Sequence, residues 1–235
     1  DFAADRYDDP AERDLLTPGG RQIILDGNAG GSSLYSEVFA FEWLARCELA
    51  TLLKTETQIT YDVVGKKADL LVEIDGRKVG VSVTRAVTFP FGQPYTLAAA
   101  TTLFERKLDD LQLATMQVSA ADRWTSQMVV AEAYDLQHAQ MAMQAWSMLD
   151  ATTRGATILI VYVTSGDDRF IYTDVLGVET EEVDDAVEPA LDIVVRWSQG
   201  DAELLQPLDA LLASFVRQRR MKLSGEYQPC YRIVA

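Results

Sequence analysis

The stretch from Glu56 to Arg85 constrains the fold more than any other part of the chain. Its pattern is typical of three consecutive strands, and the last two flank Asp75-Gly76, a pair that favours a tight hairpin because Gly accepts a positive φ. Counting back along the ladder from this turn places Asp69 opposite Ser82. Because side chains alternate along a strand, Thr84 then shares the face of Asp69 and Ser82. We expect a site there.

The remaining chain alternates helical and extended patterns. We expect helices at residues 34–53, 96–113 and 135–149 and over most of 190–222. We expect strands at residues 21–26, 54–62, 68–74, 77–85, 124–131, 156–164 and 170–175, and an edge strand at 231–234. The sequence shows no internal repeat and no low-complexity linker. It therefore predicts one α/β domain over residues 21–235, preceded by a flexible arm over residues 1–20.

Charge and hydropathy limit the partners. With 21 basic and 36 acidic residues the net charge is −15, so the chain repels a phosphate backbone unless a local basic stripe attracts it. Basic residues cluster at Lys66, Lys67, Arg77 and Lys78, at Arg106 and Lys107, and at Arg217, Arg219, Arg220 and Lys222. Most groups of this kind are solvated faces. No apolar run is long enough to span a membrane, and we expect an intracellular protein of the cytoplasm or nucleus.

Glu37 is the carboxylate most tightly tied to a helical pattern. Within the helix expected at 34–53 it stands three residues after Leu34 and four before Phe41, so it borders or enters the buried face. An unpaired carboxylate there is costly. Two interpretations remain open, an edge glutamate that reaches solvent or a lysine, and a carboxylate aimed at the sheet as a metal ligand.

Other chemistries have weaker support. The Gly-rich loop at residues 27–33 could cradle a phosphate, but it lacks the Walker lysine and also suits a plain connection that ends in a Ser N-cap. His138 is the sole histidine, and its place in an amphipathic helix favours a core or surface role over nucleophilic catalysis. Two cysteines and one histidine show no zinc-ligand spacing.

The order of the expected elements resembles the core of the restriction-endonuclease-like superfamily, whose motif is PD-(D/E)XK. That order is a helix with Glu37, a strand, a strand that begins at Asp69, a strand that ends in a polar pair, and a helix. The resemblance implies a mixed central sheet flanked by helices. It also implies that Glu37 and Asp69 hold Mg²⁺ or Mn²⁺, hard cations that prefer carboxylate oxygens. Ala68 replaces the proline of the motif.

The third strand departs from this motif. Ser82 stands in the acidic position and Thr84 in the lysine position. Three alternatives follow: Arg85 or Lys107 supplies the missing cation, Glu56 or Glu73 supplies the missing carboxylate, or the site is inactive and the fold serves binding.

A second resemblance covers about 135 residues. The elements LLKTE (52–56) and VSVTRA (81–86) are similar to those of a group of uncharacterised eukaryotic proteins, which implies a restriction-endonuclease-like fold but no established activity. It places Lys54 and Glu56 around the site with Glu37 and Asp69.

Two functions are consistent with these patterns. The first is an atypical, divalent-metal-dependent nuclease or phosphodiesterase, in which Glu37 and Asp69 bind the metal, Glu56 assists, and Lys54, Arg85 or Lys107 neutralises the phosphate. The second is an inactive nuclease-fold module that binds a protein or nucleic-acid partner. The sequence alone leaves open whether the chain is an enzyme.

Overall fold

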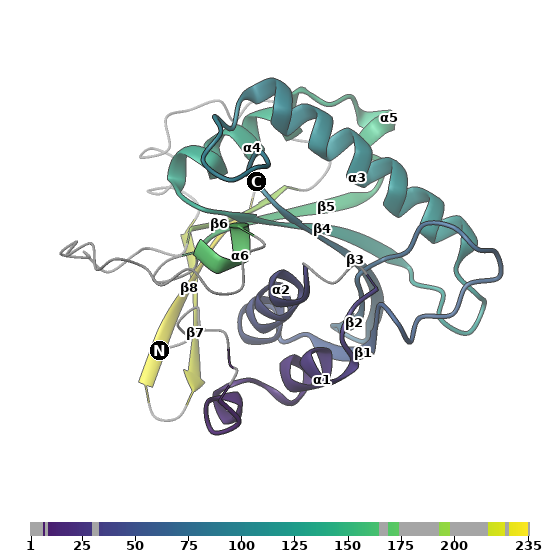
Figure 1. Cartoon of the computed structure of the whole chain (residues 1–235), viewed down its shortest axis with the longest axis vertical. Helices are drawn as coiled ribbons and strands as arrows, with labels where there is room; N and C mark the ends of the chain where they lie inside the picture. The colour runs from purple at the N-terminus through teal and green to yellow at the C-terminus, as the bar shows by residue number, and fades with distance from the viewer. Residues whose placement is uncertain are drawn as a thin grey trace.

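A mixed sheet between two layers of helices forms the body of the molecule (Figure 1). The computed structural model describes residues 7, 9–29, 33–164 and 169–173, together with the backbone of residues 193–197, 216–223 and 226–234. The predicted α/β class, with a mixed central sheet flanked by helices, is confirmed.

The elements have the following bounds. The helices are η1 (Glu12–Leu15), α1 (Pro18–Asp26), α2 (Leu34–Cys47), α3 (Leu97–Gln117), α4 (Leu136–Met148), α5 (Ala151–Arg154) and α6 (Arg169–Thr173). The strands are β1 (Thr51–Thr55), β2 (Leu70–Ile74), β3 (Arg77–Arg85), β4 (Ser126–Ala133), β5 (Thr157–Val163), β6 (Ile193–Trp197), β7 (Val216–Leu223) and β8 (Glu226–Val234).

The sheet has the strand order β1-β2-β3-β4-β5-β6-β8-β7. Strands β1, β2 and β3 form an antiparallel meander, whereas β3, β4 and β5 are parallel. Parallel neighbours need a crossover connection, and α3 provides it between β3 and β4, as α4 and α5 do between β4 and β5. Figure 1 shows α3, α4 and α5 on one face of these strands and α1 and α2 on the other.

The β2–β3 hairpin has the predicted register. Ile74 pairs with Arg77 and Leu70 with Val81. Asp75 and Gly76 have φ angles of 50° and 72°, as a two-residue turn of this hairpin type requires. Continuing this register places Asp69 opposite Ser82, as the sequence predicts.

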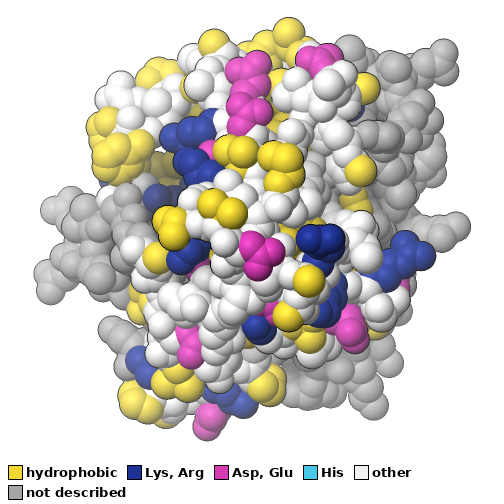
Figure 2. All heavy atoms as spheres, turned by 90° about the vertical axis from the view of Figure 1, so that its right-hand side faces the viewer, with side chains coloured by type: hydrophobic (Ala, Val, Ile, Leu, Met, Phe, Trp, Pro, Cys, Tyr) yellow, Lys and Arg dark blue, Asp and Glu magenta, His cyan; other side chains and the backbone are white. Residues whose placement is uncertain are grey.

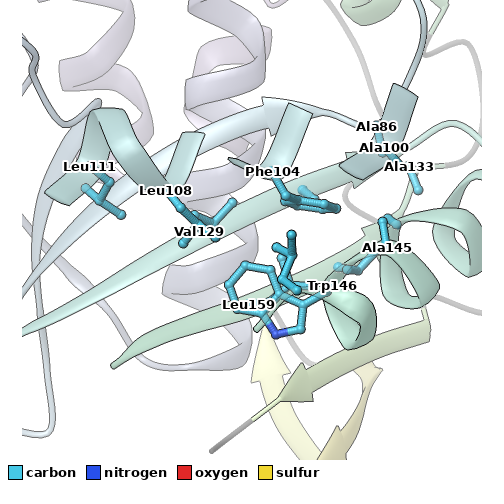
Figure 3. Packing of buried hydrophobic residues seen from close by; sticks show 14 of the residues in the cluster. Ala86, Ala100, Phe104, Leu108, Leu111, Val129, Ala133, Ala145, Trp146 and Leu159 are labelled. Carbon is cyan, nitrogen blue, oxygen red and sulfur yellow. The ribbon is translucent and has the colours of Figure 1, made fainter. Parts of the chain in front are cut away.

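A hydrophobic core lies on each side of the sheet, and β3 contributes its valines to one of them. Val79, Val81 and Val83 pack with residues of α2. On the opposite face, α3 and α4 cover the sheet, and Phe104 packs edge to face on Trp146 with ring centroids 5.7 Å apart (Figure 3). Because both faces are covered, the polar residues of β3 are buried between helix and sheet rather than exposed to solvent.

Helix α2 ends earlier than predicted, at Cys47 instead of residue 53. Leu49 has a φ of 57°, and the N–H of Ala50 donates to the carbonyl of Leu44, an arrangement that terminates helices through a left-handed residue. The chain then enters β1, which covers residues predicted to be helical. The sequence misled because Leu at the left-handed position gives no stop signal, unlike Gly.

Leu49→Gly is therefore expected to stabilise the protein. Leu49 is exposed, so its replacement removes little packing, while relief of the left-handed strain gains about 1 kcal/mol. Urea unfolding would measure the change. Leu113→Gly is the matched control, because Leu113 is a partly exposed residue inside α3, where Gly costs about 1 kcal/mol. Destabilisation by both substitutions would contradict the proposed strain.

Five further predictions of secondary structure were wrong. The strand expected at 54–62 is β1, which ends at Thr55 and is followed by a turn. Residues 21–26 lie in α1, which Thr17 caps by accepting from the N–H of Gly20 and which Pro18 begins. Residues 170–173 lie in α6 rather than a strand. The described parts of 190–222 are strands β6 and β7, and β8 lies between them instead of at the edge. The periodicity of a short apolar run does not distinguish a helix from a strand. Whether such a run forms a strand depends on the presence of a neighbouring strand to pair with.

The described part of the expected N-terminal arm packs against the domain. Tyr7 and Leu16 are buried, and Tyr7 contacts Phe39 of α2 with ring centroids 6.1 Å apart. Residue 20, where the arm was expected to end, lies inside α1. These contacts tie residues 7–20 to the helical layer below the sheet.

Candidate functional site

The candidate site lies where β3 continues past the start of β2. Pairing between the two strands begins at Leu70 and Val81, and just before it the N–H of Asp69 donates to the Val81 carbonyl over 2.9 Å. One step further along β3, the N–H of Val83 donates to the Asp69 carboxylate (Oδ2) over 2.6 Å. The Asp69 carboxylate thus accepts a hydrogen bond that the backbone of a neighbouring strand would otherwise accept. Since pairing stops here, groups from both faces of the sheet can approach one point.

A cavity of about 260 Å³ opens at this point. We call it the Asp69 pocket. Its polar and charged lining consists of Ser33, Ser36, Glu37, Asp69, Thr84, Arg85, Arg106 and Lys107. Helix α2 supplies Glu37, and helix α3 supplies Lys107 from the opposite face. The structure therefore brings five of the predicted site residues together, namely Glu37, Asp69, Thr84, Arg85 and Lys107.

Lys107 lies beside Asp69 and the end of β3. Its ammonium (Nζ) donates to the Val83 carbonyl over 2.7 Å and to Ser82 Oγ over 3.4 Å, and lies 3.9 Å from Asp69 Oδ2. Ser82 in turn donates to Asp69 Oδ2 over 3.1 Å. These contacts on Asp69 all use Oδ2, which leaves Oδ1 for a ligand.

Glu37 enters the buried face of α2, where it is 1% exposed. Its Oε1 accepts from Asn28 Nδ2 over 2.9 Å and from Ser33 Oγ over 3.1 Å. Its Oε2 is buried and has no hydrogen-bond partner in the described part of the chain. An unsatisfied buried carboxylate oxygen calls for a physical explanation. Of the two sequence interpretations, the glutamate that reaches solvent was wrong.

Burial raises the pKa of Glu37 to about 8, and the negative charge of Asp69 adds to the increase. The hydrogen bonds from Asn28 and Ser33 oppose this shift without cancelling it. Glu37 is consequently protonated over most of the neutral range. A cation between Glu37 and Asp69 would oppose the shift and lower the pKa of Glu37, because it favours both carboxylates in the charged form.

Glu56 lies beside the Asp69 pocket but does not line it. Its Oε2 accepts from the N–H of Ala29 over 2.9 Å, and its charge contributes to the raised pKa of Glu37. The loop after α1 therefore satisfies carboxylates through Asn28 and Ala29. Residues 27–29 and 33 are the described part of the loop for which the sequence left open a phosphate cradle or a plain connection, and there Asn28 and Ala29 donate to these carboxylates. Ser33 is the N-cap residue of α2, but its side chain makes no capping hydrogen bond.

Lys54 is not part of the pocket lining. Its ammonium donates to Asp122 Oδ2 over 2.7 Å. Desolvation raises the pKa of Asp122, but hydrogen bonds from Lys54 and Thr60 outweigh it and lower the pKa to about 2. Lys54 is thus committed to an ion pair that joins β1 to the segment before β4. Of the predicted cations, Arg85 and Lys107 line the pocket and Lys54 does not.

The β3 residues in the motif positions make structural contacts. Ser82 is buried and bonded to Asp69, and Thr84 is 7% exposed on the pocket wall. Arg85 Nη1 donates to the carbonyl of Ile171 over 2.9 Å. Glu73 is exposed on β2 opposite Lys78, which places it outside the lining of the pocket.

Sequence reasoning missed several residues of the site. Asn28 and Ser33 hold Glu37, while Arg106 and Tyr172 line the pocket. The polar residues that precede a helix containing a buried glutamate were a usable signal for the first two. Tyr172 had no signal, because it comes from α6, far along the chain.

Metal-ligand candidates are sparse. The described residues contain no group of three or more His, Cys, Asp or Glu side chains that could hold a metal ion. Glu37 and Asp69 form a pair rather than such a group. A pair still suits Mg²⁺, which retains several waters and binds through one or two carboxylates plus phosphate oxygens of the substrate.

The expected basic stripe is broken up on the surface shown in Figure 2. Lys and Arg side chains occur there in small groups among acidic and hydrophobic side chains. Lys66 pairs with Asp110, and Lys78 donates to the carbonyl of Ala121. The side chains of the basic group at 217–222 lie outside the described residues. Among the helices that the structure describes, none combines the length and hydropathy needed to cross a bilayer.

Comparison with known proteins gives two matches. Residues 194–234 match the family model "Pyrimidine/purine nucleotide monophosphate nucleosidase, C-terminal". The chain is also similar to a Dictyostelium discoideum protein, "AAC-rich mRNA clone AAC4 protein", with 33% identity over 153 residues. No solved structure matches significantly.

Both matches are partial. The family match covers residues 194–234, of which the structure describes only the backbone of β6, β7 and β8. The Dictyostelium match covers 63% of this chain but only 22% of that protein. The chain thus spans about a fifth of the length of the curated relative it matches.

Proposed function

We propose that the Asp69 pocket is the active centre of a divalent-metal-dependent nuclease or phosphodiesterase. The observation that carries this proposal is the buried, unpartnered Oε2 of Glu37, which lines the same cavity as Asp69 and Lys107. Two carboxylate residues and a lysine that line one pocket would form a cation site next to an anion site. Metal-assisted phosphoryl transfer requires that combination.

The residues present fit Mg²⁺ or Mn²⁺. Glu37 Oε2 and Asp69 Oδ1 would hold the ion, which when bound supplies an activated water and neutralises charge on the phosphorus. Lys107, fixed by the Val83 carbonyl, positions a positive charge beside the scissile phosphate. Arg106 adds charge at the rim of the pocket. Ser82 orients Asp69 rather than binding the metal.

The order α2-β1-β2-β3-α3-β4, with β3 antiparallel to β2 and parallel to β4, supports a restriction-endonuclease-like core. Within that core we assign the lysine role to α3 instead of β3. The name of the family matched at 194–234 concerns nucleotide monophosphates, which is compatible with a nucleotide-containing ligand. We place the activity inside the cell, where nucleic acid and millimolar Mg²⁺ are present.

A second candidate function is an inactive nuclease-fold module that binds a nucleic acid or a protein. The observation that favours it is the state of Asp69, whose Oδ2 already accepts from Ser82 and Val83. In this case Lys107 would serve as the counter-ion of Asp69 and the raised pKa of Glu37 would keep it neutral.

Cleavage assays separate the two candidates. The purified chain would be incubated with single- and double-stranded DNA and RNA in Mg²⁺, in Mn²⁺ and in EDTA. We expect cleavage that requires metal and falls by about a hundredfold in Lys107→Met, because removal of one charged stabilising group costs that much. Lys66→Met is the matched control, since Lys66 forms an exposed ion pair with Asp110 away from the pocket. Absence of both cleavage and metal binding would favour the module.

A further inference from the structure

A second cavity, of about 500 Å³, lies next to the Asp69 pocket. Its walls come from the segment between β3 and α3 and from the start of α4, and we call it the Tyr134 cavity. Phe91, Tyr95, Tyr134, Asp135, Gln137 and His138 are among its lining residues. Its volume is within the range of small-molecule sites. None of the chemistry described above uses it.

One aromatic cluster separates the two cavities. Tyr172 lines the Asp69 pocket, whereas Phe91 and Tyr134 line the Tyr134 cavity. The ring of Tyr172 lies 5.8 Å from that of Phe91 and 5.4 Å from that of Tyr134, measured between centroids. Val87 lines both cavities. The two cavities therefore adjoin the same aromatic cluster and share one wall residue.

The Tyr134 cavity combines flat apolar surfaces with polar groups. The Phe91 and Tyr134 rings meet edge to face at 4.9 Å, and Tyr95 stacks on His138 at 5.4 Å. Asp135 holds the imidazole of His138 over 2.6 Å. Tyr95 is 8% exposed, and its hydroxyl is buried with no hydrogen-bond partner among the described residues. Burial of this hydroxyl without a partner costs free energy.

We propose that the Tyr134 cavity binds the base of a nucleotide unit whose phosphate lies in the Asp69 pocket. A nucleobase offers a π face for the aromatic walls and polar edges for hydrogen bonds, and stacking on aromatic side chains tolerates all bases. The neighbouring Lys107 and Arg106 attract the phosphate. This inference deepens the proposed function and rests on it for the phosphate position, but the base site itself stands on the second cavity.

Binding without metal tests the inference. The intact chain in EDTA would be titrated by calorimetry with nucleoside 5′-monophosphates, with ribose 5-phosphate, and with a single-stranded hexanucleotide. We expect the monophosphates to bind at least about tenfold more tightly than ribose 5-phosphate, because only they carry a base that can stack. A tighter hexanucleotide would identify a unit of a nucleic-acid chain as the ligand, whereas equal affinity would identify a free nucleotide.

Gln137→Trp provides a steric block. Gln137 is an exposed residue of α4 on the cavity wall, so an added indole fills the cavity without disturbing the core. We expect nucleotide affinity to fall at least about tenfold while ribose 5-phosphate affinity stays unchanged. Gln140→Trp is the matched control, because Gln140 is exposed on the same helix and does not line the cavity.

Three results would overturn the inference: equal binding of monophosphates and ribose 5-phosphate, nucleotide binding that survives Gln137→Trp, or no nucleotide binding at millimolar concentration. Because the titration involves neither metal nor turnover, its outcome is independent of cleavage. Base-dependent binding by a chain that cleaves nothing would refute the proposed nuclease and retain the base site. Cleavage without base-dependent binding would refute the base site and retain the proposed nuclease.

Discussion

Asp69→Asn is expected to lower metal-dependent phosphodiester cleavage by about a thousandfold, since a metal contributes several kcal/mol to the transition state and each 1.4 kcal/mol is tenfold in rate. Asp69 lines the same pocket as Glu37, and its carboxylate accepts from Ser82 and Val83. Asn retains the shape and one oxygen but loses the charge. The initial rate of cleavage of a labelled oligonucleotide in Mg²⁺ measures the effect.

The control for this substitution is Asp110→Asn. Asp110 pairs with Lys66 on the outer side of α3, so its loss removes one surface charge and leaves the pocket intact. We expect its cleavage rate to stay within twofold of the wild type. If Asp69→Asn and Glu37→Gln both cleave at the wild-type rate, the active centre lies elsewhere in the chain.

Glu37→Gln is expected to stabilise the metal-free protein at alkaline pH while it removes activity. The folded pKa of Glu37 is about 8 against 4.5 for an ordinary glutamate, so the folded state holds a proton that the unfolded chain releases above pH 4.5. Stability is therefore lost as pH rises from 4.5 to 8. Gln cannot ionise, and by pH 8.5 it should avoid a cost of a few kcal/mol.

Thermal unfolding in EDTA at pH 5 and at pH 8.5 would measure this difference. A chain of this length shifts its Tm by roughly 2–4 °C for each kcal/mol, so the variant should melt several degrees higher at pH 8.5 and close to the wild type at pH 5. Glu105→Gln, on the exposed face of α3, should melt like the wild type at both. A Glu37→Gln variant with no gain at pH 8.5 would contradict the buried, orphaned carboxylate.

Local signals predicted the centre of the fold well. Asp75-Gly76 set the register that places Asp69 opposite Ser82, and helical spacing placed Glu37 on the buried face of α2. Both inferences depend on residues close in sequence. They fix the strand and the helix that carry the two carboxylates before any tertiary contact is known.

Contacts between residues far apart in the sequence could not be predicted from local patterns. Lys54 was placed at the site, but its partner is Asp122, 68 residues away, and nothing in the local pattern indicates that contact. Strand β6 pairs with β5 and β8, and β8 also pairs with β7, partners that lie far apart in the sequence. The Tyr134 cavity needs the segment before α3 to meet the start of α4, so residues such as His138 could only be judged singly from the sequence.

The small side chains of β3 affect the site through the space that they leave, whereas the charged residues affect it through electrostatics. A side chain at Gly80 would overlap the Trp124 ring at 2.5 Å, and Ser82, two residues on, leaves room for the Lys107 ammonium to reach the Val83 carbonyl. A larger side chain at position 82 would displace the Lys107 ammonium away from β3. Side-chain volume along one strand thus determines which element can deliver the positive charge. A lysine from a helix can replace one that is absent from a strand where the side chains of that strand are small enough.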